Sequence, residues 1–276
     1  MFGEITMQKR LNKIQYAEFQ LAKKLKKVCE IEGLNCFMLG GAMLGAIRHE
    51  GFIPWDDDMD FGLKREEYER LYNVLSTGKY DLKVMSYKEN NSHYYPLKIV
   101  DPEFQIISEN SKDKEKNYVW IDIFPIDGTP NNYLSRKFHE FNLLKDRALL
   151  KLSQLNTIVA VNNPSRTTLE KIIITLGGII NTEKLLDEKK RMDVLDKHLN
   201  KYKTSDSKYL VNFMGAYKFK EMFTAQIYSN YIKYKFEDTE FLGIKDYDFY
   251  LKQLYGDYMT PPRKEDRDKH KVSLKK

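Results

Sequence analysis

The sequence predicts an α+β protein, in which a mixed β-sheet flanked by helices forms the core and an additional helical lobe is attached. Short strand-like and helical segments alternate through residues 36–75, and further β-like runs follow up to residue 124. From about 131 to 202 the pattern becomes helical and rich in lysine. We therefore predict a core formed by residues 1–130 and 206–276, with residues 131–205 as the inserted lobe.

Composition excludes several classes of protein. With 42% hydrophobic and 13% aromatic residues among 276, the chain can bury a real core and is not predicted to be disordered. The 46 Lys and Arg against 40 Asp and Glu are spread along the chain, whereas a nucleic-acid-binding protein usually concentrates its basic residues. The mild positive charge fits an anionic small molecule or an acidic membrane surface equally well.

The cellular compartment is predicted from two further features. Cys29 and Cys36 lack metal-type spacing and are expected to be reduced thiols of a reducing cytoplasm. The N-terminus lacks the apolar core of a signal peptide, and the apolar run at 172–180 is shorter than the roughly 20 residues that a bilayer requires. We predict a cytoplasmic protein, with peripheral contact at the inner face of the plasma membrane left open.

The first third of the chain predicts a helix, a strand, a helix and a strand. Residues 8–32 carry apolar residues at helical spacing, and Gly33 is predicted to end this helix. Residues 36–39 are predicted to form a buried strand, residues 42–49 a helix, and DMDFGL from Asp58 a second strand. The apolar stripe of the first helix consists of Leu11, Ile14, Ala17, Leu21, Leu25 and Val28.

Further elements follow in order. Residues 64–75 are predicted to form a helix with Tyr68, Leu71 and Leu75 on one face. Asp101-Pro102 is predicted to separate two of the β-like runs that come next. These runs lie at residues 81–87, 94–100, 103–108 and 118–124. In the lobe a loop at 162–168 is predicted to separate helices, and a final helical stretch covers 247–259.

The acidic segment DDDMD at residues 56–60 predicts a cation site, because crowded carboxylates repel one another unless something cationic lies among them. On a strand Asp58 and Asp60 would project from one face, with Met59 and Phe61 on the other. Two oxygen donors so placed suit Mg²⁺, one ion or a pair, for which Mn²⁺ could substitute. Asp122, between hydrophobic neighbours on a later strand, is the predicted third carboxylate of a two-metal clamp.

Other acidic residues receive different predictions. Asp127 is predicted to be a turn residue that positions the strand before it, in preference to a catalytic group. Asp56 and Asp57 either support the metal ligands from behind or cap backbone amides in the turn.

Gly40 and Gly41 predict a phosphate site, since a helix that begins directly after a glycine pair presents backbone amides to an anion. A strand, a glycine pair, a helix, a turn and then an Asp-x-Asp pair on the next strand is typical of nucleotidyltransferases. The glycines would hold the nucleotide phosphates while the aspartates carry Mg²⁺ on the same phosphates.

Three residues between these motifs keep two interpretations each. Arg48 either clamps a phosphate or pairs with the acidic cluster. His49 is a general base, or a histidine that satisfies carbonyls at the end of its helix. Trp55 is an aromatic wall for the substrate, or a plug beneath the turn.

The segment LGGAMLGAIRHEGFIPWDDDMDFGL, together with IDIFPID at 121–127, closely resembles the signature of the LicD family. The resemblance returns in FLGIKDYDFYLKQLYGDYMTPP and departs at Ala42, where many members have Thr or Ser. It implies a nucleotidyltransferase fold, with the aspartate pair and Asp122 as metal ligands and the glycine pair as the phosphate-binding turn.

The resemblance also implies a reaction. Bacterial members of the family are implicated in moving phosphocholine from CDP-choline to sugars of teichoic-acid or lipopolysaccharide precursors, with release of CMP. A lipid-linked glycan would then be the acceptor. Transfer of ribitol or glycerol phosphate from another CDP-alcohol, use of an NTP with release of pyrophosphate, and an inactive scaffold in wall-polymer assembly are the alternatives.

Choline is a quaternary ammonium, and its recognition requires aromatic faces. The sequence offers many candidates and does not choose among them: Tyr94, Tyr95, Trp120, Phe124 and Tyr217. Lys98 is either a residue that steers phosphate or an exposed lysine at a strand edge.

Overall fold

The computed structural model describes residues 11–89, 92–108, 118–155 and 182–263, with 265, 267 and 272–274 near the C-terminus. The predicted loop at 162–168 and the apolar run at 172–180 lie outside the described residues. Among the helices of the described part, none is long and apolar enough to cross a membrane.

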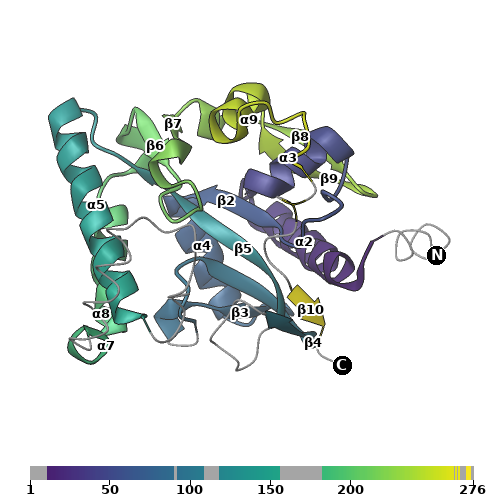
Figure 1. Ribbon diagram of the computed structural model, residues 1–276, viewed down its shortest axis with the longest axis horizontal. Coiled ribbons are helices and arrows are strands. Elements are labelled where there is room, and N and C mark those ends of the chain that lie inside the picture. The colour runs from purple at the N-terminus through teal and green to yellow at the C-terminus, as the bar shows by residue number, and fades with distance from the viewer. Residues whose placement is uncertain are drawn as a thin grey trace.

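A mixed β-sheet occupies the centre of the molecule (Figure 1). Its main path runs β10-β4-β5-β2-β1-β9-β8, in which β2 with β5 and β1 with β9 are parallel pairs. The α+β class predicted from the sequence is confirmed. The strands are β1 Phe37–Met38, β2 Asp60–Lys64, β3 Lys83–Met85, β4 Leu97–Ser108, β5 Tyr118–Gly128, β6 Tyr209–Val211, β7 Met222–Thr224, β8 Tyr231–Phe236, β9 Thr239–Ile244 and β10 Val272–Leu274.

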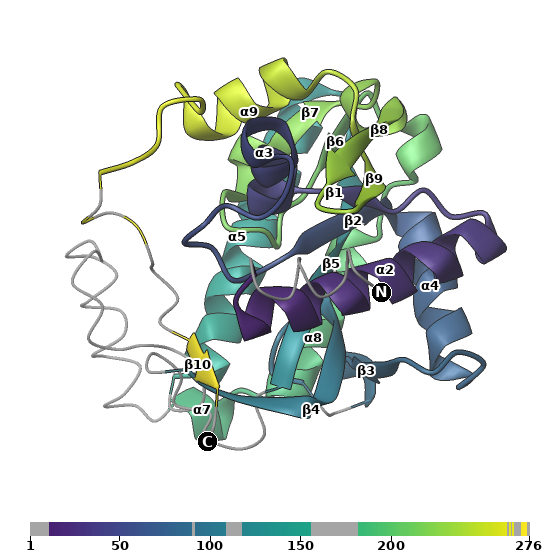
Figure 2. The ribbon, with the colours of Figure 1, turned by 90° about the vertical axis from the view of Figure 1, so that its right-hand side faces the viewer.

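Helices pack on this sheet and beside it. In Figure 2 helix α2 lies across the strands, and it contacts β4 and β5, whereas α4 packs on β2 and β5. Helices α5 and α8 pack on each other at one side of the sheet (Figure 1). The described helices are α2 Lys13–Glu32, α3 Gly40–His49, α4 Arg65–Ser76, α5 Tyr133–Ser153, α7 Thr182–Leu185, α8 Glu188–Leu199 and α9 Tyr247–Tyr255.

The N-terminal helix and its predicted end at Gly33 are confirmed, but α2 begins at Lys13 and not near residue 8. Asn12 and Gln15 form a reciprocal capping box, in which the Asn12 side chain accepts from the Gln15 amide at 2.9 Å. Gly33 ends α2 in the left-handed conformation, at φ 61°. All six residues of the predicted apolar stripe are buried.

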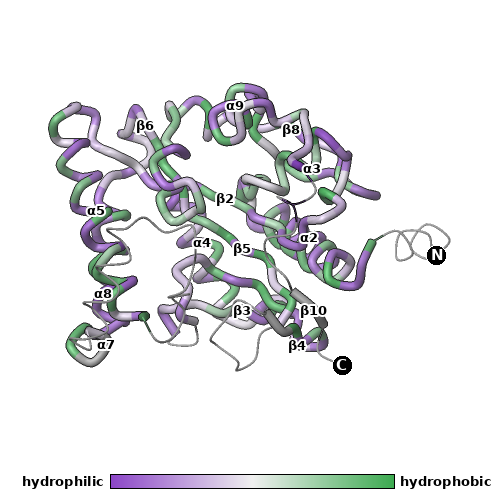
Figure 3. The backbone as a smooth tube through the Cα atoms, in the orientation of Figure 1, coloured by the Kyte–Doolittle hydropathy of each residue, from purple (hydrophilic) through white to green (hydrophobic). Residues whose placement is uncertain are grey.

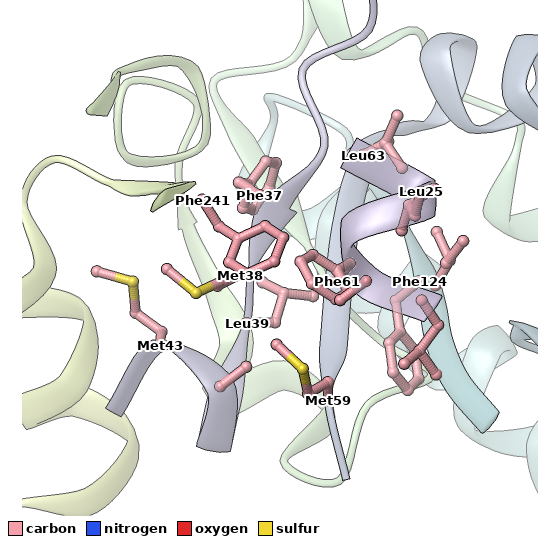
Figure 4. Close-up of a cluster of buried hydrophobic side chains, with 14 of the residues drawn as sticks. Leu25, Phe37, Met38, Leu39, Met43, Met59, Phe61, Leu63, Phe124 and Phe241 are labelled. Atoms are coloured by element: carbon pink, nitrogen blue, oxygen red, sulfur yellow. The ribbon is translucent and has the colours of Figure 1, made fainter. Parts of the chain in front are cut away.

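Strand β2 delivers its alternate residues to the core. Figure 4 shows Met59, Phe61 and Leu63 within one apolar cluster that also contains Phe37 and other labelled side chains. Figure 3 shows how hydropathy varies along the chain. The central strands are largely hydrophobic, whereas α5 alternates between hydrophilic and hydrophobic residues. Asp60 is partly exposed between buried neighbours on this strand, as the alternation predicts.

Several predicted boundaries are wrong, among them the start of the second strand, because β2 begins at Asp60 and Asp58 lies in the loop before it. Helix α3 begins at Gly40 and so includes the glycine pair. Strand β4 continues through Asp101-Pro102. Its pairing with β5 shifts register between Asp101 and Gln105, so the proline lies at an irregularity of the strand. Strand β5 runs on to Gly128, so Asp127 is a strand residue paired with Val211 of β6 and not a turn residue.

The lysine-rich region contains the helices α5, α7 and α8. Residues of α5 and α8 form a second apolar cluster with residues around β6, so these helices close over one end of the sheet. The division of the chain into a catalytic core and an inserted lobe stays a prediction.

Candidate functional site

The glycine pair and the acidic segment line one pocket of about 250 Å³. Its first wall comes from the start of α3 and the loop before β2, and includes Gly40, Gly41, Asp56, Asp58 and Asp60. Its second wall comes from the C-terminal third of the chain and includes Asn212, Gly215, Tyr217, Glu221 and Tyr255.

Gly40 makes the turn into helix α3. Its φ of +47° lies in the left-handed region, which glycine adopts without a steric cost. Its amide donates to the Tyr250 hydroxyl at 3.0 Å, which ties the turn to helix α9. At Gly41 a Cβ would lie 2.7 Å from Asp56 Oδ2, so only glycine lets the acidic loop approach the helix start this closely. The first turn of α3 therefore faces the pocket with its amide end, which favours an anion.

Asp60 and Asp122 are register partners on the parallel strands β2 and β5. Neighbouring strands lie about 4.8 Å apart, so the two carboxylates project side by side. The Lys98 ammonium lies 2.9 Å from Asp122 Oδ1, and the Trp120 indole donates to Oδ2 at 2.9 Å. Asp122 thus lies next to the pocket with its charge compensated by Lys98. This pairing gives Lys98 a role that neither sequence interpretation contained.

The Asp60 carboxylate lies in an environment that disfavours its negative charge. Removal from water raises its pKa well above the ordinary value, and repulsion from Asp58 and Asp122 raises it further. No hydrogen bond to this carboxylate is found among the described residues. A cation beside it would reverse both effects, so the donors fit a hard divalent ion.

The geometry for such an ion is partial. In the described part of the chain, no three His, Cys, Asp or Glu side chains converge as the ligands of a metal ion. Mg²⁺ is commonly held by one or two carboxylates together with substrate phosphates. Asp58 and Asp60 agree with this pattern, because they line the same pocket as the glycine turn. The metal assignment of Asp58, Asp60 and Asp122 remains a prediction.

Helix α2 contributes two polar residues that the sequence interpretation missed. The Gln15 side chain donates to the Asp56 carbonyl at 2.8 Å and so holds the acidic loop in place. Glu18 is 2% exposed, and its Oε2 has no hydrogen-bond partner among the described residues. Burial raises the Glu18 pKa well above its ordinary value, and the charges of the nearby aspartates raise it further. Their signal in the sequence was a pair of polar residues within the apolar stripe of a helix.

Arg48, His49 and Trp55 form a neighbouring cluster and do not line the described pocket. Arg48 donates to the Tyr258 carbonyl at 2.7 Å and to His49 Nε2 at 3.0 Å. The guanidinium of Arg267 lies 4.1 Å from the centre of the Trp55 ring. Burial and then the Arg48 charge lower the His49 pKa, so this imidazole is neutral at pH 7. The cluster braces the turn before β2 against the C-terminal segment.

Asp127 lies outside the pocket in a buried polar network. Its Oδ1 accepts from Arg65 at 2.6 Å, and both side chains are 2% exposed. Arg65 also binds Asp196 of α8 at 3.0 Å and the Tyr95 hydroxyl at 2.9 Å. Asp127 does position its strand, but it does so through this ion pair and not through a turn.

The second wall of the pocket was absent from the predicted site except for Tyr217. The Glu221 carboxylate accepts from Asn212 Nδ2 at 2.8 Å and from the Tyr217 amide at 3.3 Å. Burial raises its pKa to about 7. No local pattern in NFMGAYKFKE revealed this wall, because only the tertiary fold brings it to the glycine turn.

The five aromatic candidates for choline recognition lie in three different places in the structure. Phe124 and Tyr217 line the pocket. Tyr94 and Trp120 face Lys98, whose ammonium lies 4.9 and 4.3 Å from their ring centres. Tyr95 belongs to the Arg65 network.

Comparison with known proteins agrees with this architecture. Residues 33–154 match the family model described as LicD/FKTN/FKRP, nucleotidyltransferase domain. The chain is 28% identical over 250 residues to the lipopolysaccharide cholinephosphotransferase LicD of Haemophilus influenzae, covering 89% of each protein. Over 48 residues, 17% of this chain and 10% of the relative, it is 40% identical to the human and mouse ribitol 5-phosphate transferase FKRP.

Proposed function

Because residues 33–154 match the model of the LicD/FKTN/FKRP nucleotidyltransferase domain, we propose that this protein is a phosphotransferase acting on cell-surface glycan precursors. The group transferred is phosphocholine, the donor is CDP-choline, and the acceptor is a sugar hydroxyl of a teichoic-acid or related precursor. The observation that carries this proposal is the meeting of the glycine turn and the acidic loop in one pocket. The similarity to the Haemophilus enzyme extends over nearly the whole chain, which favours phosphocholine over other groups.

The first turn of α3 holds the donor. The Gly40 amide donates to Tyr250, so the amides that follow it at the start of α3 stabilise the diphosphate, and the left-handed Gly40 lets the phosphates approach the backbone. Asp58 and Asp60 would hold Mg²⁺, which would neutralise phosphate charge during transfer. Asp122, compensated by Lys98, is the proposed third carboxylate of this set.

In the reaction the acceptor oxygen forms a bond to the phosphorus that carries choline. The bond from this phosphorus to the bridging oxygen breaks, and CMP leaves with that oxygen and its electron pair. The proton of the acceptor hydroxyl passes to a base beside the pocket, and Asp122 is the candidate either for this base or for holding a second metal ion. The turn at Gly40 and Gly41 contributes by holding the donor in line with the acceptor.

Transfer of ribitol phosphate is the second candidate. It is supported by the similarity to the ribitol 5-phosphate transferases, which is confined to 48 residues at 40% identity. Both reactions release CMP and use the same glycine and aspartate residues, so they differ only in what the pocket accepts beyond the phosphate.

Release of CMP by the purified protein tests the proposal. Parallel reactions contain Mg²⁺, an amino-sugar glycan acceptor and one donor each: CDP-choline, CDP-ribitol, CDP-glycerol or CTP. We expect CMP from CDP-choline, and none after addition of EDTA. CMP released only from another CDP-alcohol would show that this alcohol, and not choline, is the group transferred. Pyrophosphate released from CTP would show that the protein catalyses nucleotidyl transfer instead. No product from any donor would favour an inactive scaffold.

A further inference from the structure

The pocket wall opposite the acidic loop has the chemistry of a cation site. We propose that Tyr217, Tyr255 and Glu221 recognise the quaternary ammonium of the donor. This inference rests on the proposed function, because it assigns residues to the choline end of CDP-choline.

The two tyrosine rings form a corner. Their centroids lie 5.5 Å apart and their planes meet at 87°. Tyr217 is 38% exposed, and both tyrosines line the pocket. The Lys220 ammonium, which donates to the Leu254 carbonyl, lies 5.6 Å from the centre of the Tyr217 ring, so this ring already faces one cation. A round cation placed in such a corner contacts the electron-rich face of a ring, which is how aromatic sites bind trimethylammonium groups.

Glu221 places a buried carboxylate behind this corner, and the charge of the nearby Arg147, whose guanidinium donates to the Phe213 carbonyl, offsets part of the rise in the Glu221 pKa. Glu221 is 3% exposed, and its two hydrogen-bond donors, Asn212 and the Tyr217 amide, are neutral. Within the described residues it forms no ion pair. Gly215 leaves the carboxylate space, since a Cβ there would lie 2.4 Å from Glu221 Oε1.

This arrangement favours a quaternary ammonium over a polyol. An aromatic face and a buried carboxylate attract a cation through charge, and trimethylammonium needs no hydrogen bond because it has no proton to donate. A polyol has no positive charge and would gain no attraction of this kind from the aromatic face. Burial raises the Glu221 pKa to about 7, and a bound cation would favour its ionised form.

The corner also lies at the correct end of the pocket. The Tyr255 hydroxyl and Asp60 Oδ2 are 3.6 and 3.7 Å from the position that a Cβ on Gly40 would occupy. The phosphate turn is therefore adjacent to the tyrosine corner. In phosphocholine only a two-carbon linker separates the nitrogen from the phosphate ester oxygen, so one ligand reaches both.

Steady-state kinetics of the full-length protein test the assignment. We expect Tyr217→Leu to raise KM for CDP-choline about tenfold with a smaller effect on kcat, since an aromatic face contributes this order of binding energy to a cation. Tyr217→Phe keeps the ring and should recover most of the affinity. Glu221→Gln should raise KM as well. Tyr133→Leu, at an exposed tyrosine of α5, is the matched control and should behave as wild type.

Tetramethylammonium chloride serves as an independent probe. It should compete with CDP-choline in the wild-type protein and lose this effect in Tyr217→Leu. A wild-type protein that turns over CDP-choline while Tyr217→Leu leaves KM unchanged would overturn the tyrosine assignment alone. A wild-type protein that turns over only CDP-ribitol or another neutral alcohol donor would overturn both this inference and the proposed function.

Discussion

Replacing Gly41 by alanine should separate the activity of this protein from its stability. The added Cβ would lie 2.7 Å from Asp56 Oδ2, whereas an ordinary contact at such a position is 3.4–4 Å. The Asp56 side chain is half-buried on a loop, so it and the acidic loop must move away from the start of α3. Displacements of this size at a reacting centre reduce rates on the order of 100-fold.

The effect of this substitution on the free energy of unfolding should be small, because two opposing contributions nearly cancel. Alanine in place of a helical glycine normally stabilises by about 0.5–1 kcal/mol, which offsets the local crowding. We therefore expect the free energy of unfolding in urea to change by less than about 1 kcal/mol, while kcat/KM for CMP release falls about 100-fold.

Gly78→Ala is the matched control with the opposite pattern. Gly78 has φ +72°, and its Cβ would meet no atom within 4 Å, so alanine there is strained but does not collide. This variant should lose about 1–2 kcal/mol of stability and keep its activity. Wild-type kcat/KM in Gly41→Ala would refute the role of the glycine turn.

Three further predictions concern buried charge. Arg65→Met should lower the free energy of unfolding by about 3–5 kcal/mol in urea titrations, because it leaves buried carboxylates unpaired; a loss below about 1 kcal/mol would contradict the network. Burial lowers the pKa of His139 to about 4. As pH drops below 6.5, the unfolded chain therefore protonates this imidazole while the folded protein keeps it neutral. The free energy of unfolding should fall by about 2–3 kcal/mol between pH 6.5 and 4.5. His139→Phe should remove that dependence in urea titrations at the two pH values, and an unchanged slope would refute it. Burial raises the Glu18 pKa, so metal-free protein should lose stability as pH rises toward that value; Glu18→Gln should flatten the profile of melting temperature against pH, and parallel profiles would contradict this.

Local patterns predicted much of the first wall of the site. The apolar stripe and Gly33 located helix α2, and the alternation in DMDFGL placed Met59 and Phe61 in the core. The same alternation indicated that Asp60 faces away from them. These features depend on residues close in sequence, which is why periodicity and turn chemistry were sufficient.

The second wall could not be predicted because it depends on distant pairings. The β8–β9 hairpin joins the sheet through a parallel contact between β9 and β1, in which Leu242 pairs with the distant Phe37. That contact and the fold around β6 bring Glu221 and Tyr255 to the glycine turn. Asp127 resembled a turn residue beside Pro125 and Gly128, and only its buried contact with Arg65 reveals its structural role.

Transfer of label from CDP-choline tests the central claim most directly. CDP-choline labelled in the choline methyl groups is incubated with Mg²⁺, an amino-sugar glycan and either wild-type protein or Asp60→Asn. We expect the glycan to gain label in equal amount to the CMP released by the wild type, and no transfer by the variant. CMP without labelled glycan, or full transfer by Asp60→Asn, would contradict a phosphocholine transferase that acts through this acidic pocket.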